Sequence, residues 1–326
     1  MDAGPDLAPP ARPDRHGALR RALTALLVLA AFAFLGLAVA RDWGALRDYD
    51  WSLRPVRLFL SLPPLIGAFC IGVLTWHRTL LALGGQVVPF PLLLRIWFLS
   101  SLARYIPGKI WQFVGTARMA ADAGLPAPLL LTSLLLSMGF NVIAAGVVGA
   151  ALLPEAGFLP DHWRAPLLLV ALAIAALATS PTLLNACLRL VPRALHRSVL
   201  SWQARWSTGL WLLLLAAAGW LVYGAGFWLF VGAITTAEPA TFAPLTAANA
   251  LAFLAGYLVV IAPAGLGARE LSMAALLQPI LGVGAGMAAL IAIASRLWVV
   301  AGELLGAGTV LVLARRRGAT PPSVLW

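Results

Sequence analysis

The order of apolar and polar positions divides the chain into eight apolar segments, separated by charged or proline-containing stretches. About 20 apolar residues in an α-helix cross the hydrocarbon core of a bilayer, which is roughly 30 Å thick. The pattern therefore predicts an all-α polytopic membrane protein. The segments are 22–40, 58–76, 87–103, 125–153, 165–188, 207–237, 242–262 and 282–314.

Two of these segments end at a break and are followed by a short apolar return piece. The first break, at residues 104–109, leads into 110–117, and the second, at 263–270, leads into 271–277. Proline and glycine at these breaks interrupt a regular helix. We therefore expect two re-entrant helical hairpins and about six full spans.

The two halves of the chain share this layout. Segment starts pair as 22 with 165, 58 with 207, 87 with 242 and 125 with 282. Such matching is typical of transporters built from internal repeats. The pattern predicts a first membrane repeat over 22–153 and a second over 154–315. We expect residues 1–21 to form a mobile cytoplasmic tail and 316–326 a cytoplasmic C-terminal tail.

Composition supports the membrane assignment. Hydrophobic residues make up 61% of the chain and charged residues 11%, against roughly 25% charged in a soluble domain. A cytosolic enzyme, a nucleic-acid-binding module and a disordered protein are therefore excluded. The net charge of +11 is carried by scattered arginines, since Lys109 is the only lysine. Cys70 and Cys187 fall inside apolar runs, where we expect small buried side chains.

Basic residues in the short loops predict the orientation. The loop 189–206 carries four arginines and no acid, and Arg315, Arg316 and Arg317 follow the last segment. Both places are expected in the cytoplasm. The loop 41–57 is a misfit, because it carries four arginines on the predicted outer side. Hairpins entering from opposite sides give inverted halves. Eight full crossings would instead give parallel halves, and loop charge alone does not decide between these.

Helix breaks at membrane depth are tolerated where the backbone is buried in protein or lines a wet cavity. Half-helix N-termini at such a break attract anions, and Arg104, Lys109 and Arg269 add positive charge. The alternative is a pair of interfacial turns with snorkelling cations. Because the breaks occupy matched positions of the two halves, we interpret them as a transport site.

Arg296 and Glu303 are seven residues apart in the last segment and share one helix face. They pair with each other, or with Glu270 and the Arg104/Lys109 cluster, and a purely structural ion pair is the alternative. Asn141 and Asn249 are candidates for interhelical hydrogen bonds. The candidate substrate-binding residues are Arg104, Tyr105, Pro107, Gly108, Lys109, Gln112, Pro263, Gly265, Gly267, Arg269, Glu270, Arg296 and Glu303.

Signals for an enzyme are weak. The histidines show no metal-ligand spacing, and the chain has no phosphate-cradling loop or nucleophile elbow. We therefore expect no catalytic residue, no metal and no cofactor. Asp48 and Asp50 form a short acidic pair, which polytopic glycosyltransferases often use to hold a metal. The alternative is a solvated loop with acids placed there by chance.

Residues 104–115, RYIPGKIWQFVG, resemble the first signature of the lysylphosphatidylglycerol synthase transmembrane-region family, a flippase-like domain. Residues 263–270, PAGLGARE, resemble its second signature, with Ala264 where glycine is usual. The resemblance covers about residues 20–315. It implies two inverted halves with re-entrant helices, and some members move aminoacylated phospholipid between leaflets.

The resemblance implies a lipid transporter or flippase-like protein in the bacterial cytoplasmic (inner) membrane. The expected partner is a membrane lipid with an anionic or polar headgroup, isoprenoid-linked lipids included. The chain stops at Trp326 without a synthase domain, so we expect no lipid aminoacylation. A glycosyltransferase using a lipid-linked sugar and a non-transporting scaffold for a lipid-modifying enzyme are the alternatives. No nucleic-acid partner is expected, and the oligomeric state is open.

Overall fold

The computed structural model contains helices and no strand over the residues that it describes. These are 53–85, 87–103, 111–153, 160–190, 201–259 and 267–316, together with 33, 36–37 and 39–47. The helices are α2 (Trp43–Arg47), α3 (Pro55–Ala82), α4 (Phe90–Leu102), α5 (Trp111–Asp122), α6 (Ala127–Leu152), η3 (Asp161–Trp163), α7 (Arg164–Ala178), α8 (Pro181–Leu190), α9 (Trp206–Ile234), η5 (Pro239–Thr241), α10 (Phe242–Leu258), α11 (Ala268–Leu281) and α12 (Ala285–Arg316).

Within these ranges, five helices are long and apolar enough to cross a membrane: α3, α6, α9, α10 with η5, and α12. The bent pair α7 and α8 brings the number to six if it counts as one span. The prediction of an all-α polytopic membrane fold is confirmed. The predicted span 22–40 lies almost wholly outside the described residues.

The segment 165–188, expected as one continuous span, is bent. Its two parts, Ala165–Ala178 and Pro181–Arg189, meet at 65°. Proline lacks a backbone N–H and favours the first turn of a helix, so a new helix begins at Pro181. The hydroxyl of Ser180 accepts a hydrogen bond from the Leu183 N–H at 3.3 Å and so caps this helix. The continuous span predicted here is therefore wrong in shape.

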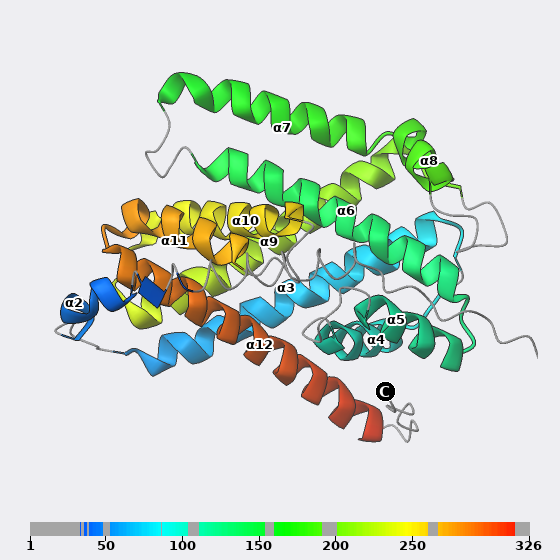
Figure 1. The fold of residues 1–326 in the computed structure, drawn as a ribbon. Coiled ribbons are helices and arrows are strands. Elements are labelled where there is room, and N and C mark those ends of the chain that lie inside the picture. Colours follow the sequence, from blue (N-terminus) through cyan, green and yellow to red (C-terminus); the bar gives the residue numbers. More distant parts are fainter. Residues whose placement is uncertain are drawn as a thin grey trace, which may run out of the picture.

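The helices on either side of the two breaks pack as two pairs. α5 packs against α4, and α11 packs against α10. Figure 1 shows α4 and α5 toward the right-hand end of the long helices, and α11 toward the left-hand end. The two pairs differ in length, because Pro239–Leu258 is long enough to cross a bilayer and Phe90–Leu102 is shorter. The first break, 104–109, and residues 263–266 of the second lie outside the described residues, while residues 267–270 are described.

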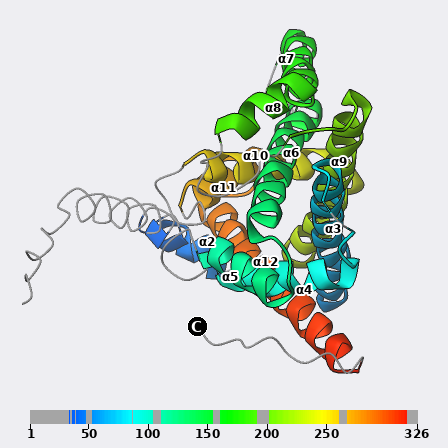
Figure 2. The ribbon, with the colours of Figure 1, turned by 90° about the vertical axis from the view of Figure 1, so that its right-hand side faces the viewer.

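α3 and α9 occupy equivalent places in the two halves and pack antiparallel along most of their length (Figures 1 and 2). The Arg54 N–H donates to the Ala233 carbonyl at 3.0 Å where α3 begins and α9 ends. Near the other end of α3, Gly84 lies beside Gln203. The contact is close because Gly226 has no side chain, and an added Cβ would lie 3.0 Å from the Ser61 carbonyl oxygen.

The helices that precede the two breaks also pack across the halves. α4 of the first half packs against α12 of the second, and α10 of the second half packs against α6 of the first. Parallel halves would place equivalent helices in the same direction, whereas inverted halves place them in opposite directions. The antiparallel pairing of α3 with α9 agrees with the inverted arrangement, which stays a prediction. The repeat boundaries at 22–153 and 154–315 stay a prediction.

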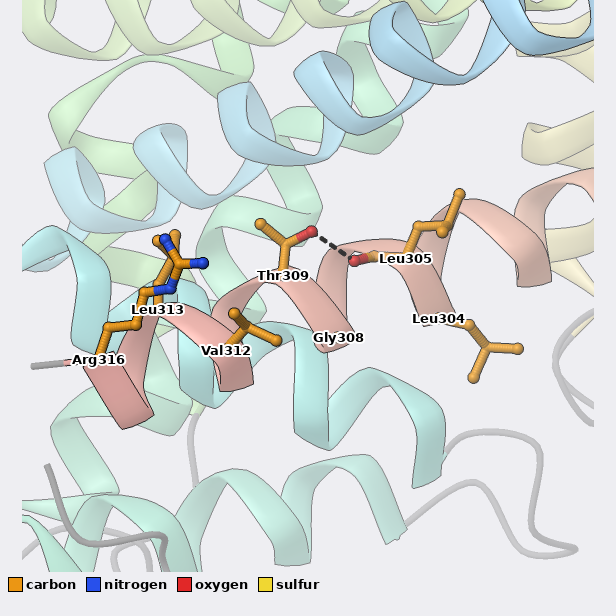
Figure 3. A pocket seen from close by; sticks show the side chains of 7 residues that line it. All are labelled: Leu304, Leu305, Gly308, Thr309, Val312, Leu313 and Arg316. Atoms are coloured by element: carbon orange, nitrogen blue, oxygen red, sulfur yellow. Dashed lines mark hydrogen bonds between the residues drawn. The ribbon is translucent and has the colours of Figure 1, made fainter. Parts of the chain in front are cut away.

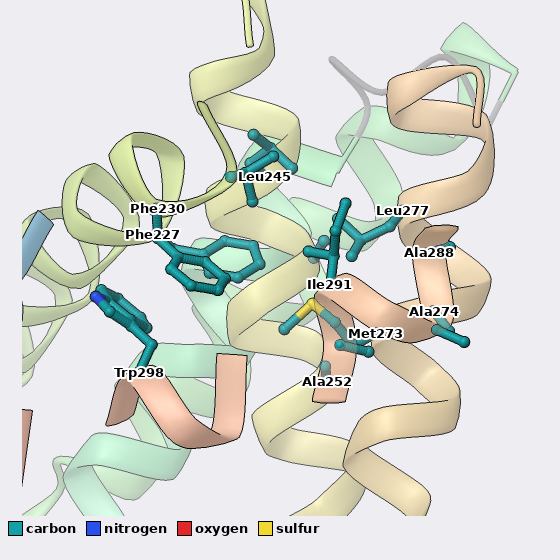
Figure 4. Packing of buried hydrophobic residues seen from close by; sticks show 14 of the residues in the cluster. Phe227, Phe230, Leu245, Ala252, Met273, Ala274, Leu277, Ala288, Ile291 and Trp298 are labelled. Atoms are coloured by element: carbon teal, nitrogen blue, oxygen red, sulfur yellow. The ribbon is translucent and has the colours of Figure 1, made fainter. Parts of the chain in front are cut away.

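Buried aromatic side chains fasten the long helices together. In Figure 4, Phe227 and Phe230 of α9 lie beside Trp298 of α12, and the Phe230 and Trp298 rings stack at 5.1 Å. The Trp298 indole N–H donates to the Ser61 hydroxyl of α3 at 2.8 Å. A second buried indole, that of Trp76, donates to Ser133 of α6 at 2.9 Å. These bonds satisfy indole groups that no solvent reaches.

The basic loop 41–57 makes specific contacts with helix ends. The Gly286 N–H, in the first turn of α12, donates to the Asp42 carboxylate at 2.6 Å. The Arg57 guanidinium donates to the Gly232 carbonyl near the C-terminus of α9 at 3.4 Å. An acid at a helix N-terminus and a base at a C-terminus are both favourable. Arg57 thus has a structural role, although its charge does not fit the outer side on which the sequence predicts this loop.

Candidate functional site

A cavity of about 490 Å³ lies at the centre of the bundle, and both halves of the chain line it. α3, α4, α5 and α6 contribute from the first half, and α9, α10, α11 and α12 from the second. Its polar and charged lining residues are Gln112, Ser137, Asn141, Arg269, Arg296 and Glu303. A polar site enclosed by apolar spanning helices is expected to serve a function.

α11 begins at this cavity, and Glu270 stabilises that beginning. Gly267 precedes the helix with φ of +87°, a conformation that favours glycine. The Gly267 N–H donates to Glu270 Oε2 at 2.7 Å. The other carboxylate oxygen, Oε1, lies 2.8 Å from Nε of Arg296 on α12. Glu270 is 1% exposed. One buried carboxylate therefore both caps α11 and ties it to α12.

Arg269 adjoins Glu270 but has a different environment. Its side chain lines the cavity and is 7% exposed. Its Nε has no hydrogen-bond partner among the residues that the structure describes. A guanidinium is always charged, and a buried charge without full compensation is costly. Arg269 also stands in the first turn of α11, where the helix dipole adds positive potential. This part of the cavity is suited to an anion.

Glu303 lines the same cavity and is fully buried, at 0% exposure. It stands two turns after Arg296 on α12. Gln112 enters from α5 and is 8% exposed. The structure thus brings together Gln112, Arg269, Arg296 and Glu303, with Glu270 directly behind Arg296. The other candidates from the sequence, Arg104, Tyr105, Pro107, Gly108, Lys109, Pro263 and Gly265, lie outside the described residues.

Aromatic side chains form much of the remaining wall, and sequence reasoning missed them. Trp220 of α9 stacks on Tyr223 at 5.4 Å and contacts Phe253 of α10 at 5.0 Å. Phe69 of α3 continues this row of rings, with its ring 6.3 Å from Tyr223 and 5.3 Å from Trp97 of α4. All five line the cavity. The spacing of Trp220 and Tyr223 places them on one helix face, but helices this apolar give no sign of which face is inside.

The two asparagines predicted to join helices behave differently. At Asn141, the backbone carbonyl accepts a hydrogen bond from the Trp220 indole at 3.0 Å, while the residue itself lines the cavity. Asn249 on α10 is 0% exposed, and its side-chain atoms have no partner within the described ranges. For the cysteines, Cys70 is partly buried, but Cys187 is exposed. The expectation that Cys187 is a small buried side chain was wrong, because α8 turns that face outward.

A second hollow, of about 400 Å³, lies on the outer face of α12 near its C-terminus. Figure 3 shows its lining, where leucine and valine side chains predominate and Arg316 stands at the helix end. The Thr309 hydroxyl donates to the Leu305 carbonyl at 2.8 Å, within the same helix. The described residues that line this hollow all come from α12, and their apolar side chains suit contact with lipid.

Within the described ranges, no group of three or more His, Cys, Asp or Glu residues is placed to hold a metal. Asp48 and Asp50, the acids considered for a glycosyltransferase, lie outside those ranges. The charged lining of the central cavity offers guanidinium donors and a carboxylate. Such groups suit an anionic or polar ligand held by charge-assisted hydrogen bonds.

Comparison with known proteins gives one match. The model of a family described as "Lysylphosphatidylglycerol synthase TM region" matches residues 18–305. No curated protein and no solved structure matches. The matched range includes both breaks and all the cavity-lining residues named above.

Proposed function

The chain belongs to the lysylphosphatidylglycerol synthase TM region family, and from this premise we propose that it moves a lipid with an anionic or polar headgroup between the leaflets of the membrane. It is a multi-pass membrane protein of a family with a lipid-related function. The proposal assigns it no reaction and no cofactor. The cargo class includes isoprenoid-linked lipids as well as phospholipids.

The observation that supports this proposal most directly is the environment of Arg269. A buried guanidinium, whose Nε has no hydrogen-bond partner among the described residues, lines a cavity at the N-terminus of a helix. A phosphate ester placed there would receive charge-assisted hydrogen bonds and would compensate a charge that is costly when alone. A volume of about 490 Å³ falls in the range of pockets that enclose small ligands. The cavity therefore suits a headgroup.

The aromatic part of the wall supports a lipid over a soluble anion. Phe69, Trp97, Trp220 and Phe253 offer ring faces beside the charged lining. Aromatic side chains favour boundaries where one end of a ligand is apolar and the other polar. A headgroup with the first carbons of its chains matches such a surface. Inorganic phosphate would use only the charged part.

The exposed arginines support the orientation that we propose. Arg78, Arg189, Arg205, Arg315 and Arg316 are all exposed. Figure 1 shows the ends of α3, α8 and α12 toward the right, opposite α2. Basic residues at membrane boundaries mark the cytoplasmic side and contact anionic headgroups. We propose that this end faces the cytoplasm of a bacterial inner membrane and that both termini lie there.

Translocation in vesicles tests the proposal. The protein is reconstituted into phosphatidylcholine vesicles with a trace of fluorescent NBD-phosphatidylglycerol, and dithionite quenching reports the lipid that reaches the outer leaflet. Wild type should speed this exchange. Arg269→Ala should slow it roughly 10–100-fold, because hydrogen bonds to a charged group contribute about 1.5–3 kcal/mol. Lys109→Ala should also slow it.

Two controls keep the result specific. Arg269→Lys keeps the charge and should retain part of the rate, and the exposed Arg189→Ala should match wild type. Soluble glycerol phosphate added as a competitor separates a lipid site from a plain phosphate site, since the aromatic wall contributes only to lipid. If wild type moves no lipid, or if Arg269→Ala and Lys109→Ala move it at the wild-type rate, the proposal is overturned.

A further inference from the structure

We propose that the part of the cavity lined by α5 and α6 recognises a neutral hydroxylated group, a polyol or a sugar, which phosphate joins to the transported lipid. This inference rests on the proposed function and narrows its cargo class. It starts from two carboxamide side chains that line the cavity, Gln112 of α5 and Asn141 of α6. Carboxamides are uncharged groups that recognise a ligand through hydrogen bonds.

The hydrogen bonds at these two residues engage the backbone and not the side chains. The Thr116 hydroxyl donates to the Gln112 backbone carbonyl at 2.9 Å, and the Trp220 indole N–H donates to the Asn141 backbone carbonyl at 3.0 Å. Among the described residues, neither side-chain amide has a hydrogen-bond partner. Gln112 is 8% exposed and lines the cavity. Because a buried amide without hydrogen bonds is unfavourable, this wall suits a polar ligand.

The packing of α5 against α6 brings these amides to one part of the wall. The two helices form a hairpin, joined by the loop 123–126. Gln112 and Ser137 are each eleven residues from the nearer end of this loop, so the antiparallel helices place them at about the same level. Asn141 follows Ser137 by one turn, on the same face. The Ser137 hydroxyl donates to the Leu134 carbonyl at 2.8 Å, and its oxygen can still accept from a ligand.

The chemistry of a carboxamide matches hydroxyl groups better than it matches an amine. Each amide carries two N–H donors and an acceptor oxygen. A hydroxyl both donates and accepts, so a polyol or a sugar can satisfy both ends of an amide, whereas an ammonium group only donates. The described lining residues from α5 and α6 include no acid with which a cationic group would pair. This part of the wall therefore favours a neutral hydroxylated group.

Aromatic rings beside Asn141 add a surface for the carbon atoms of such a group. Trp220, whose indole is bonded to Asn141, stacks on Tyr223 and contacts Phe253. Tyr223 and Phe253 are partly buried and line the cavity. The face of an aromatic ring carries partial negative charge, so it attracts the C–H groups of a polyol or of a sugar ring. Amides and ring faces together suit a carbon frame that carries hydroxyl groups.

One headgroup can use both halves of the chain, because both halves line the same cavity. Arg269 of the second half is placed for the phosphate, and Gln112 and Asn141 of the first half are placed for the hydroxyl groups. Two kinds of lipid carry this chemistry. They are glycerophospholipids with a polyol headgroup and isoprenyl phosphates that bear a sugar, and the experiment tests each kind.

The experiment compares lipids that differ only in hydroxyl groups. The full chain is reconstituted in phosphatidylcholine vesicles with a trace of NBD-phosphatidylglycerol or of NBD-phosphatidylpropanol, which has the same charge and headgroup carbons. Wild type should exchange the glycerol lipid roughly 5–150-fold faster, because propanol loses two hydrogen bonds between neutral groups. Changing both Gln112→Leu and Asn141→Leu should make the two rates nearly equal. The exposed Gln203→Leu is the matched control and should keep the wild-type ratio. A ratio from one preparation does not depend on the folded fraction.

A second pair of probes, the hexose and propyl esters of an isoprenyl phosphate, identifies the kind of lipid, since the pair with the larger ratio fits the site better. Equal rates within both pairs for wild type, or faster exchange of NBD-phosphatidylethanolamine than of the glycerol lipid, would overturn the inference and leave lipid transport standing. A wild-type ratio in the double variant would overturn the assignment to these two amides. If wild type moves none of the probes, the proposed function itself fails, and this inference fails with it.

Discussion

The ion pair between Glu270 and Arg296 allows a quantitative test of how the cavity is held together. The two side chains approach to 2.8 Å and are 1% and 18% exposed. Removing one partner of a buried pair leaves an uncompensated charge and typically costs 3–5 kcal/mol. Because Arg296 is partly exposed, we expect the lower end, about 3 kcal/mol, for Glu270→Gln and for Arg296→Gln alike. That corresponds to a fall in Tm of roughly 6–12 °C.

The double variant distinguishes an ion pair from two independent contributions. With both residues changed to Gln, neither partner of the pair leaves the other's charge behind, and replacement of a whole buried pair by uncharged side chains of similar volume costs far less than removal of one partner. We therefore expect the double variant to lie within about 1 kcal/mol of wild type, which makes the two substitutions strongly non-additive. Gln at position 270 also keeps an oxygen that accepts from the Gly267 N–H.

The assay is thermal unfolding in a fixed detergent, followed by tryptophan fluorescence. Scan rate and protein concentration are held constant, because such unfolding is often irreversible. Glu238→Gln is the matched control, since Glu238 is an exposed acid outside the cavity, and it should leave Tm unchanged. If the single variants unfold like this control, or if the double variant loses the sum of both, the pair does not hold α11 to α12.

Two further predictions concern the core and the topology. Trp298→Phe should lower the free energy of unfolding by about 1–2 kcal/mol, because it removes the buried hydrogen bond to Ser61. Trp211→Phe, at an exposed tryptophan, is the control. Equal Tm values for these two variants would contradict the reasoning. Cysteines placed at Ala123 and Glu238, in a chain whose native cysteines are replaced, should be labelled from opposite sides of the membrane. Labelling of both from one side would refute inverted hairpins.

The membrane spans were predictable because hydropathy depends only on the order of residues along the chain. The apolar runs 125–153 and 207–237 correspond closely to Ala127–Leu152 and Trp206–Ile234. The bend at Pro181 was also predictable from the sequence, because serine followed by proline favours the start of a new helix. The single span was predicted from length, because residues 165–188 are enough for one crossing, and the helix start within them was not considered.

The site was predictable in part, and the missing part has a physical cause. Arg296 and Glu303 were recognisable as charges in an apolar segment, but only packing makes Glu270 the partner of Arg296. The aromatic wall was hidden for a different reason. In α9 nearly every position is apolar, so no polar face shows which side contacts lipid and which side lines the cavity.

Two adjacent residues on α11 have different roles: Glu270 stabilises the fold, and Arg269 is placed to bind a ligand. Successive side chains on a helix point about 100° apart, so Arg269 and Glu270 face different surroundings. Glu270 is committed to the helix N-terminus and to Arg296. Among the described residues, the Arg269 Nε has no hydrogen-bond partner, so Arg269 is the better placed of the two to bind a ligand in the cavity. If Glu270 were instead the partner of Arg269, the charge of Arg269 would already be compensated within the protein. The adjacency of Arg and Glu after a glycine thus stabilises a helix end inside the membrane while leaving a cation exposed to the cavity.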